Sequence, residues 1–295
     1  MTKFIKLSAN IALLWFVSAQ ATPLRAQQGQ NYDFKVGKLY YKITDDANRE
    51  VTVVSEPKTD QYYTDRPTGD VSIPAIVVKD GKVYRVTGIG DDAFCGYTTL
   101  NSITIPNSVK VIGEAAFAGC TGLASVALPY GLARIEMSVF EYCTSLTSID
   151  IPDGVTEIGH RAFANCTSLS SVSLPKSLDR MGVSVFSGCT NLTSIAIPDS
   201  VTTIGVAAFT NCASLASVAL PCNDSVWIGE YVFYGCRGLQ SVTVGWQKPL
   251  RITEDMFDNI DLSKVILTVP PGTKEAYLAA DIWQKFKITE EYFSK

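Results

Sequence analysis

From Leu100 onward, the chain repeats itself with a period of 23 residues. Five consecutive segments superimpose without a gap, a sixth from Leu215 is one residue longer, and a seventh from Leu239 is degenerate. The five regular segments read LNSITIPNSVKVIGEAAFAGCTG, LASVALPYGLARIEMSVFEYCTS, LTSIDIPDGVTEIGHRAFANCTS, LSSVSLPKSLDRMGVSVFSGCTN and LTSIAIPDSVTTIGVAAFTNCAS. A period of this length indicates one small structural unit stacked on copies of itself.

Each segment opens with the pattern L-x-S-[I/V]-x-[I/L], whose fourth and sixth residues lie on one side of an extended strand. In the third segment these are Ile149 and Ile151, whereas Ser148 and Asp150 face the other way. A single strand with one apolar side cannot bury that side alone, so the segments must stack with parallel strands about 4.8 Å apart. The sequence therefore predicts a solenoid.

Proline and glycine turn the chain within each segment. Proline follows the strand in six segments, where its missing N–H ends the strand ladder. Glycine recurs in the second half of the segments, and we expect it to supply a positive φ or a tight approach in the second corner. Glu136 takes this place in the second segment, so a positive φ is preferred there and not required. The glycines are Gly113, Gly159, Gly182, Gly205 and Gly229.

The second half of each segment also supplies three interior ladders. We expect the phenylalanines to stack ring upon ring, and the cysteines to act as small apolar residues with free thiols. Cysteines in neighbouring layers are close enough to pair, and disulfides between them are the alternative, but parallel inward-pointing side chains usually lack the dihedral angle that a disulfide requires. The ladders are Ile112, Ile135, Ile158, Met181 and Ile204; Phe117, Phe140, Phe163, Phe186 and Phe209; and Cys120, Cys143, Cys166, Cys189, Cys212 and Cys236.

The motif L-x-S-[I/V]-x-[I/L]-P followed by I-G-x-x-A-F-x-x-C resembles the BspA-like leucine-rich-repeat family of bacterial surface proteins. The match runs roughly from Leu100 to Leu262, with traces from about Ile73 to the C-terminus. The resemblance implies a curved solenoid at the cell surface or outside the cell, often associated with adhesion to host matrix proteins or to other cells. It implies no catalytic residues.

The segments that flank the repeats differ from them in pattern. Alternating apolar residues predict strands over 38–43, 50–55 and 71–78, and Asp80-Gly81 is a strong hairpin signal. The stretch from Val86 to Phe94 is already the second half of a repeat. We therefore expect residues 31–85 to form an N-terminal β-hairpin cap and residues 86–263 to form the repeat array.

At the other end, residues 264–295 are expected to close the array with a strand and a helix. The strand covers 265–269, Pro270-Pro271-Gly272 stops it, and an amphipathic helix runs from Thr273 to Phe286. Tyr277, Trp283 and Phe286 are the candidates for its buried side. The predicted fold is mainly β, a curved leucine-rich-repeat solenoid between an N-terminal β cap and a short C-terminal helix.

Residues 1–26 have the pattern of a cleaved signal peptide. Two lysines precede the apolar run from Ile11 to Val17, and small residues follow it at Ala19-Gln20-Ala21 and Leu24-Arg25-Ala26. The run is far shorter than the roughly 20 residues needed to cross a bilayer, and no later stretch qualifies. We expect an exported protein, extracellular or on the cell surface with the periplasm as the alternative, and no transmembrane segment after cleavage.

Residue types that carry chemistry are sparse. His160 is the one histidine and falls in a corner, so it cannot build a multi-histidine metal site. Asp150, Asp153 and Glu157 lie close in the third segment, and we interpret them as a solvated acidic patch rather than a cation site or glycosidase pair. A net charge of −4 without a clustered basic face does not suit nucleic-acid binding. The sequence predicts no catalytic, cofactor-binding or metal-binding residue.

Two surfaces of the predicted solenoid are candidates for ligand binding. The outward strand positions are small, polar and almost uncharged, and we interpret their serine row as structural, each hydroxyl bonding to its neighbours. Bulkier side chains gather in the corners, where repeat proteins usually place recognition. The residues predicted to bind a partner are Trp227, Tyr231, Tyr234, Tyr142 and Arg161.

Three functions remain open from the sequence. The first is a non-catalytic binding or adhesion protein that recognises a protein partner, such as a host matrix or cell-surface protein, through a solenoid surface. The alternative is an envelope carbohydrate-binding module whose exposed aromatic residues stack on sugar rings. A polysaccharide-active enzyme is the weakest of the three, because the constellations of acidic and basic residues that it needs are missing.

Overall fold

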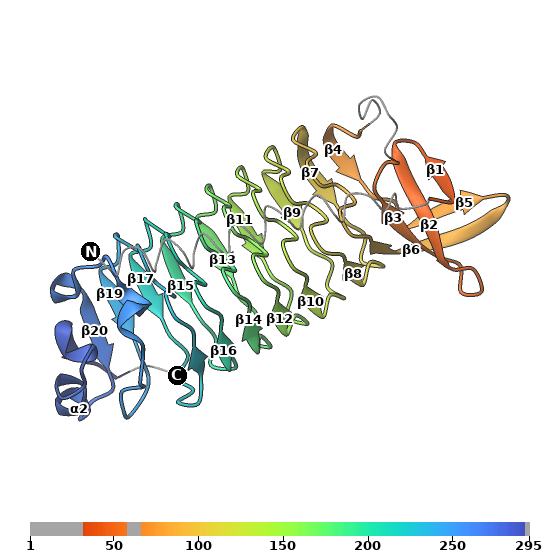
Figure 1. Ribbon diagram of the computed structural model, residues 1–295. Helices are drawn as coiled ribbons and strands as arrows, with labels where there is room; N and C mark the ends of the chain where they lie inside the picture. The colour runs from red at the N-terminus through yellow and green to blue at the C-terminus, as the bar shows by residue number, and fades with distance from the viewer. Residues whose placement is uncertain (1–31, 58–65, 293–295) are drawn as a thin grey trace.

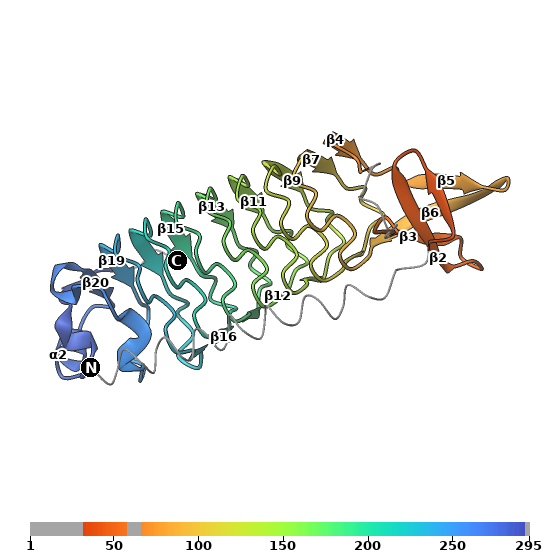
Figure 2. The ribbon, with the colours of Figure 1, turned by 45° about the horizontal axis from the view of Figure 1, so that its top comes forward.

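The computed structural model describes residues 32–57 and 66–292. It is a long stack of similar layers with a small β-sheet at the N-terminal end and a short helix at the other (Figures 1 and 2). The prediction of a mainly β solenoid with parallel strands is confirmed. The predicted signal peptide, residues 1–26, lies outside the described residues.

The first sheet consists of the strands that open each repeat. Ser148 pairs with Ser171 and Ile149 with Val172, so the pairing register equals the period of 23 residues. The apolar positions point inward, and Ile149 is only 2% exposed. These strands are β7 (Leu100–Thr104), β9 (Ser125–Ala127), β11 (Ser148–Asp150), β13 (Ser171–Ser173), β15 (Ser194–Ala196), β17 (Ser217–Ala219) and β19 (Ser241–Thr243). They pair as β7-β9, β11-β13 and β15-β17-β19, three groups in line along one side of the solenoid that we together call the first sheet.

A second sheet, which the strand pattern did not indicate, follows the proline corner. Its strands are two residues long, and β10, β12, β14, β16 and β18 pair in that order. Thr203 pairs with Trp227, 24 residues later, so the extra residue of the sixth repeat lies between β17 and β18. The strands are β10 (Arg134–Ile135), β12 (Glu157–Ile158), β14 (Arg180–Met181), β16 (Thr203–Ile204) and β18 (Trp227–Ile228). The equivalent strand of the first repeat, β8 (Val111–Ile112), belongs to the N-terminal sheet.

The phenylalanine ladder forms one continuous stack inside the solenoid. Neighbouring ring centroids are 5.2 to 5.6 Å apart and the rings are nearly parallel. The predicted stacking is confirmed, and it extends beyond the regular repeats to Phe94 at one end and Phe257 at the other.

The cysteine ladder lies beside the rings, and its six members are buried free thiols, as predicted. Each thiol also donates a hydrogen bond to the carbonyl of the phenylalanine in the preceding layer. Cys143 Sγ lies 3.2 Å from Phe117 O, and Cys166 Sγ lies 3.1 Å from Phe140 O. A donor that is also small and apolar explains the choice of cysteine at this position.

The corner glycines recur because the layers pack closely at these positions, and not because the backbone has a positive φ there. A Cβ on Gly182 would lie 2.6 Å from the backbone of Gly159 in the preceding layer, which is too close for any side chain. The expected positive φ at these glycines is therefore wrong, and the alternative of a tight approach is correct. Positive φ values occur two and six residues later, at Ser184 (56°) and Gly188 (75°) in the same layer.

The layers from Asp92 to Gly235 thus each contain a turn segment with two left-handed residues. Between the two left-handed residues, alternate residues direct their N–H groups toward the next layer. Ser138 N donates to His160 O at 2.9 Å, and Tyr142 N donates to Ala164 O at 2.8 Å. These bonds form a third ladder, so the turn segments make up a third side of the solenoid, which we call the turn side.

The N-terminal sheet has the strand order β1-β2-β3-β6-β5, and its sixth strand, β8, also pairs with β6. The predicted Asp80-Gly81 hairpin is present, with φ values of 52° and 75° at the two residues. The expected single strand over 71–78 is two strands, because Pro74 lies between them and has no N–H to donate. The strands are β1 (Phe34–Val36), β2 (Leu39–Asp45), β3 (Glu50–Val54), β4 (Gly69–Ser72), β5 (Ile76–Lys79) and β6 (Lys82–Ile89), and β4 pairs with β7.

The C-terminal end is closed by strands, short helical turns and aromatic side chains. The expected helix to Phe286 is wrong in length, since α2 ends at Leu278 and the chain then adds a parallel strand to β20. This strand, β21, satisfies the edge of β20 that a longer helix would leave unpaired. Tyr277, Trp283 and Phe286 are buried, as predicted. The elements are η1 (Glu254–Phe257), η2 (Leu262–Lys264), β20 (Ile266–Val269), α2 (Lys274–Leu278), η3 (Trp283–Lys285) and β21 (Lys287–Glu290).

Candidate functional site

The outward side of the first sheet carries the serine row. Ser102 Oγ donates to Asp70 Oδ1 at 2.7 Å, where β7 meets β4. Within residues 66–292, the hydroxyls of this row make no hydrogen bond to one another, so the expected serine ladder is wrong. Interlayer side-chain bonds occur just before the strand instead, where Ser170 Oγ donates to Thr147 O at 3.1 Å. The small serine side chains leave this surface flat and accessible.

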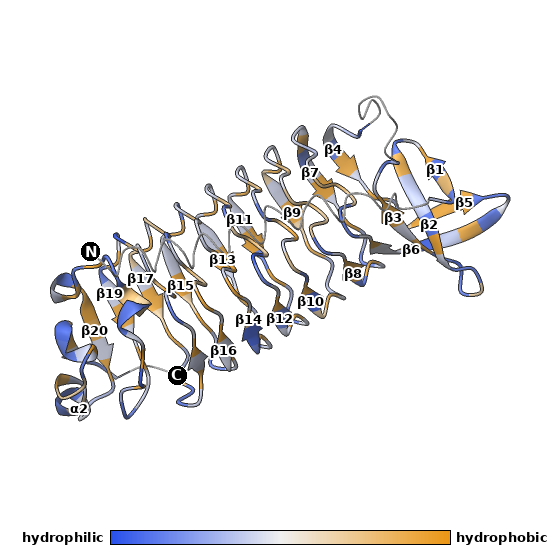
Figure 3. Cartoon of the chain, viewed as in Figure 1, coloured by the Kyte–Doolittle hydropathy of each residue, from blue (hydrophilic) through white to orange (hydrophobic). Residues whose placement is uncertain are grey.

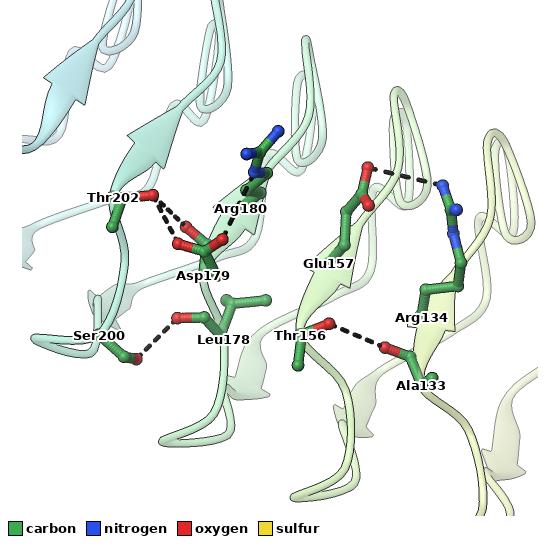
Figure 4. Close-up of polar contacts among 9 residues, drawn as sticks. All are labelled: Ala133, Arg134, Thr156, Glu157, Leu178, Asp179, Arg180, Ser200 and Thr202. Carbon is green, nitrogen blue, oxygen red and sulfur yellow. Dashed lines mark hydrogen bonds and ion pairs between the residues drawn. The ribbon is translucent and has the colours of Figure 1, made fainter.

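On the outward side of the second sheet, β10, β12 and β14 carry a row of alternating charges, Arg134, Glu157 and Arg180 (Figure 4). Arg134 lies 2.9 Å from Glu136 and 3.5 Å from Glu157, and Arg180 lies 3.4 Å from Asp179. These pairs are exposed and contribute little to stability. They also use the carboxylate of Glu157, so it does not join Asp150 and Asp153 in a cation site. The row is a neutralised, polar surface.

The five predicted contact residues lie on two sides of the solenoid. Tyr231 and Tyr234 form an edge-to-face pair with ring centroids 6.2 Å apart on the turn side of the sixth repeat. Tyr142 and Arg161 lie on the same side in the second and third repeats. Trp227 lies apart from them on β18 of the second sheet, where it is 55% exposed. The structure therefore groups four of the five residues by side and leaves Trp227 on another.

Three of these residues have a left-handed backbone. The φ values are 60° at Tyr142, 55° at Arg161 and 59° at Tyr231. Tyr142 occupies the second left-handed position of its layer, which is glycine or asparagine in the other layers. Arg161 and Tyr231 occupy the first, which elsewhere is small or is Asp92. The comparison residues are Gly96, Gly119, Asn165, Gly188, Asn211, Gly235 and Asn259 at the second position, and Asp92, Ala115, Ser138, Ser184 and Ala207 at the first.

Charged groups accompany the large side chains on the turn side. Glu141, which the sequence pattern did not single out as a contact residue, is partly buried beside Tyr142. Burial raises the pKa of Glu141, and the Ser138 hydroxyl and the Arg161 charge oppose the rise. Burial also raises the pKa of Tyr142, with a further rise from the Glu141 charge. Tyr142, Glu141 and Arg161 thus form one electrostatically connected cluster.

A similar cluster surrounds Tyr231 in the sixth repeat. Burial raises the pKa of Tyr231, and the charge and side chain of Asp255 in the following layer raise it further. Thr210 Oγ1 donates to Tyr231 O at 2.7 Å, which fixes the left-handed backbone from the preceding layer. The turn side therefore carries a tyrosine with an acidic neighbour at two places along the array.

The histidine and the acidic residues show no catalytic arrangement in the described part of the chain. His160 Nδ1 accepts a hydrogen bond from Val183 N at 2.9 Å, and Asp91 Oδ1 accepts one from Glu114 N at 2.9 Å in the equivalent place three layers earlier. His160 is thus a backbone acceptor at the corner. Residues 32–57 and 66–292 contain no group of three side chains able to hold a metal ion.

A polar hollow lies where the N-terminal sheet meets the first repeat. The hydroxyl of Ser108 is buried there without a hydrogen-bond partner among the described residues. The equivalent serines of later layers have partners one layer back. Ser177 Oγ donates to Val155 O at 2.8 Å, and Ser200 Oγ donates to Leu178 O at 2.6 Å (Figure 4). The N-terminal sheet has no corner at this place, which leaves both the hollow and the unpaired hydroxyl. The hollow is lined by Glu50, Arg85, Thr87, Asn107, Ser108, Lys110 and Val111.

Comparison with known proteins gives one consistent result. The family model described as "BspA type Leucine rich repeat region (6 copies)" matches residues 87–216 and 156–275, more than half of the chain. No curated protein matches. Across the described residues, no helix has both the length and the apolar character needed to span a membrane.

Solved structures similar to this chain are bacterial leucine-rich-repeat proteins. One from Bacteroides ovatus is 25% identical over 88% of this chain and 79% of its own, with a TM-score of 0.47. One from T. pallidum is 30% identical over 72% of this chain and 85% of its own, with a TM-score of 0.45. A leucine-rich cell-surface protein from Faecalibacterium prausnitzii is 21% identical over 89% and 95%, with a TM-score of 0.41.

Proposed function

This chain belongs to the BspA-type leucine-rich-repeat proteins, and we propose that it is a non-catalytic binding protein that recognises a protein partner through the turn side of its solenoid. The observation that carries the proposal is the left-handed backbone of Tyr142, Arg161 and Tyr231. All three are large side chains at positions where most other layers have small residues.

A left-handed backbone is costly for such residues. Placing an L-residue other than glycine or asparagine there costs roughly 1–2 kcal/mol. At the second left-handed position, Asn165 and Gly188 show that the fold is satisfied by residues without this cost, so Tyr142 is the exception there. At the first position the other layers also carry residues other than glycine, and Arg161 and Tyr231 differ from Ala207 in the size of the side chain. Strain of this kind concentrates at sites of function. Tyrosine and arginine are also the residue types that dominate binding energy at protein interfaces.

The spacing of these residues suits a large ligand. Arg161 and Tyr231 hold equivalent positions three layers apart, which at the strand spacing is about 14 Å. Ser184 and Ala207 occupy the layers between them. Two large side chains separated by two layers with small side chains suit the surface of a protein better than a single sugar or a small molecule.

A carbohydrate ligand is the second candidate, and the exposed indole of Trp227 favours it. Trp227 lies on the second sheet, away from the tyrosines, with 55% of its surface exposed. An aromatic ring in this setting can stack on the face of a sugar. Glycan-array signals that disappear in Trp227→Ala and persist in Tyr142→Asn would support this candidate in place of the first.

We further propose that the protein is exported to the cell surface or beyond it, with residues 1–26 as the leader. Mass spectrometry of the protein isolated from its cell fractions tests this directly. A mature chain that begins at Gln27 in the surface or external fraction is the expected result, whereas a full-length chain retained in the cytoplasm contradicts it.

The test of partner binding uses purified protein, matrix and cell-surface protein extracts, and identification of the captured partner by mass spectrometry. We expect Tyr142→Asn and Arg161→Ala each to weaken binding of the identified partner at least tenfold, while neither lowers the melting temperature. Tyr130→Ala is the matched control, because Tyr130 is 80% exposed but lies in the proline corner. Equal binding by the two turn-side variants and wild type would refute the turn-side site.

A further inference from the structure

We propose that two copies of this chain associate through strand β5 of the N-terminal sheet, edge to edge and antiparallel about a two-fold axis. β5 (Ile76–Lys79) is the last strand of the order β1-β2-β3-β6-β5 and pairs on one side only, with β6. It stands at the free end of the molecule, and much of it is hydrophobic (Figures 1 and 3). An edge strand of this kind is a template for another strand.

The hydrogen-bond pattern of the hairpin decides which backbone groups of β5 face outward. Val86 N donates to Ala75 O at 2.9 Å, so Ala75 directs its polar groups toward β6. Because direction alternates along an antiparallel strand, Val77 does the same, and Ile76 and Val78 direct their N–H and C=O groups away from the sheet. Each copy therefore offers two donors and two acceptors at this edge.

The side chains of the same two residues form an exposed apolar strip. Ile76 and Val78 are each 58% exposed, and Val83, which pairs with Val78 across the hairpin, is 53% exposed. Val77 points to the other side of the sheet and is only 4% exposed. Edge strands usually discourage pairing with a proline, a bulge or a charge, and neither Ile76 nor Val78 supplies one.

The edge of β5 is complementary to itself. A two-fold axis at Val77 sets Ile76 opposite Val78 of the second copy, and Val78 opposite Ile76 of the second copy. Both pairs then exchange two N–H to O=C bonds, and outward side chains meet outward side chains. An axis at Ile76 would set Pro74, which has no N–H, opposite Val78. An axis at Val78 would set the turn residue Asp80 opposite Ile76.

Charge and size define the expected strength of this contact. The lysines beside the turn, Lys79 and Lys82, lie at opposite ends of the antiparallel pair, so they do not face their counterparts. One strand per copy buries far less than the roughly 800 Å² per partner of a standard interface. The association is therefore weak and reversible, and it forms as the protein concentration rises.

Sedimentation velocity over a concentration series tests the proposal. We expect wild type to shift from monomer toward dimer as concentration rises, and Val78→Pro to remain monomeric, because proline removes an N–H that is unused in the single copy. Val78→Thr is the matched control, since it keeps both the N–H and the β-branched shape and should still dimerise. A wild-type protein that stays monomeric at about 1 mM, or a Val78→Pro variant that dimerises like wild type, would overturn the proposal.

A pair of double variants tests the register without relying on proline. Ile76→Lys with Val78→Lys sets like charges opposite each other and should abolish the dimer. Ile76→Glu with Val78→Lys sets opposite charges across the axis at Val77 and should restore dimerisation at low salt. Val83→Lys places a charge on the same surface one strand from the edge and should leave the dimer intact. Equal association of the two double variants would exclude this register.

Discussion

Residue type is constant from layer to layer in the interior of the solenoid and variable on its turn side, although both kinds of position lie within the same short segment of each repeat. In the second repeat, Phe140 and Cys143 are fully buried and match their counterparts in every neighbouring layer. Glu141 and Tyr142 lie between them and match none. A buried ladder fixes a residue because its neighbours above and below are the same residue. A position that faces solvent lacks this constraint, and only there can the chain vary for recognition.

The largest expected difference between the two regions appears at alkaline pH. Burial raises the pKa of Cys120 and of Cys166 to about 12, and it raises the pKa values of Cys143, Cys189 and Cys212 well above their ordinary range. An unfolded thiol loses its proton near pH 8.5, so the unfolded chain binds fewer protons above that pH and stability falls as pH rises. Each buried thiol contributes up to about 1.4 kcal/mol per pH unit.

We therefore expect the melting temperature to drop steeply between about pH 9 and pH 12. Cys166→Ala should make the drop shallower, and Cys222→Ala, at an exposed position, should not change it. Calorimetric scans across this pH range measure the slope. A melting temperature that does not change over this pH range would show that the ladder thiols are accessible to solvent in the folded protein.

The next largest effect is expected from breaking the ring stack. Phe163 contacts Phe140 and Phe186 at centroid distances of 5.4 and 5.3 Å and has no exposed surface. Phe163→Ala should lower the free energy of unfolding by about 3–5 kcal/mol, because it leaves a cavity between two layers. Chemical denaturation followed by circular dichroism measures the loss. A change below about 1 kcal/mol would mean that the layers close over the missing ring.

A smaller effect of opposite sign is expected on the turn side. Tyr142→Asn should raise the free energy of unfolding by about 1 kcal/mol, because asparagine tolerates the left-handed backbone better than tyrosine does. The reverse change, Asn165→Tyr, should lower it by a similar amount in the neighbouring layer. Denaturant midpoints of both variants give the comparison. A loss of stability in Tyr142→Asn would indicate that the ring packs for structural reasons.

The smallest effect is expected for the corner serines. It distinguishes Ser200, which follows another repeat, from Ser108, which follows the N-terminal sheet. Ser200→Ala should cost about 1 kcal/mol, because it removes the hydrogen bond to Leu178 O. Ser108→Ala should leave stability unchanged or raise it slightly, since the hydroxyl of Ser108 is buried without a partner among the described residues. Differences in denaturant midpoint resolve the pair. Equal losses would mean that Ser108 has a partner in the folded protein.

The sequence pattern was most informative where a residue packs against the equivalent residues of the neighbouring layers. Phe163 and Cys166 could be assigned to buried ladders from recurrence alone, because stacked equivalents must fit each other at one spacing. Glycine was predicted to be needed in the second corner, but the sequence did not decide whether for a positive φ or for close packing. Whether Gly182 needs a positive φ or room for a neighbour depends on the path of the adjacent layer, which a single repeat does not contain.

The candidate contact residues illustrate the limit more sharply. Tyr142, Arg161 and Tyr231 could be noticed as departures from the repeat, and the glycine or asparagine at the places equivalent to Tyr142 was a signal for a left-handed backbone. Their shared side of the solenoid, and the separation of Trp227 from it, required the structure. So did β21, because the need to pair the edge of β20 arises only once the layers are stacked.

The 23-residue period by itself determined that this chain is a stack of parallel strands around a ladder of rings and thiols. The reason is physical: a unit that buries one apolar side can do so only against copies of itself. Only the tertiary structure decided which groups stay unpaired where a layer lacks a neighbour, and which backbone conformation a solvent-facing residue adopts. Ser108 without its acceptor, β5 without a second partner strand and Tyr142 on a strained backbone all depend on what lies next to them in space.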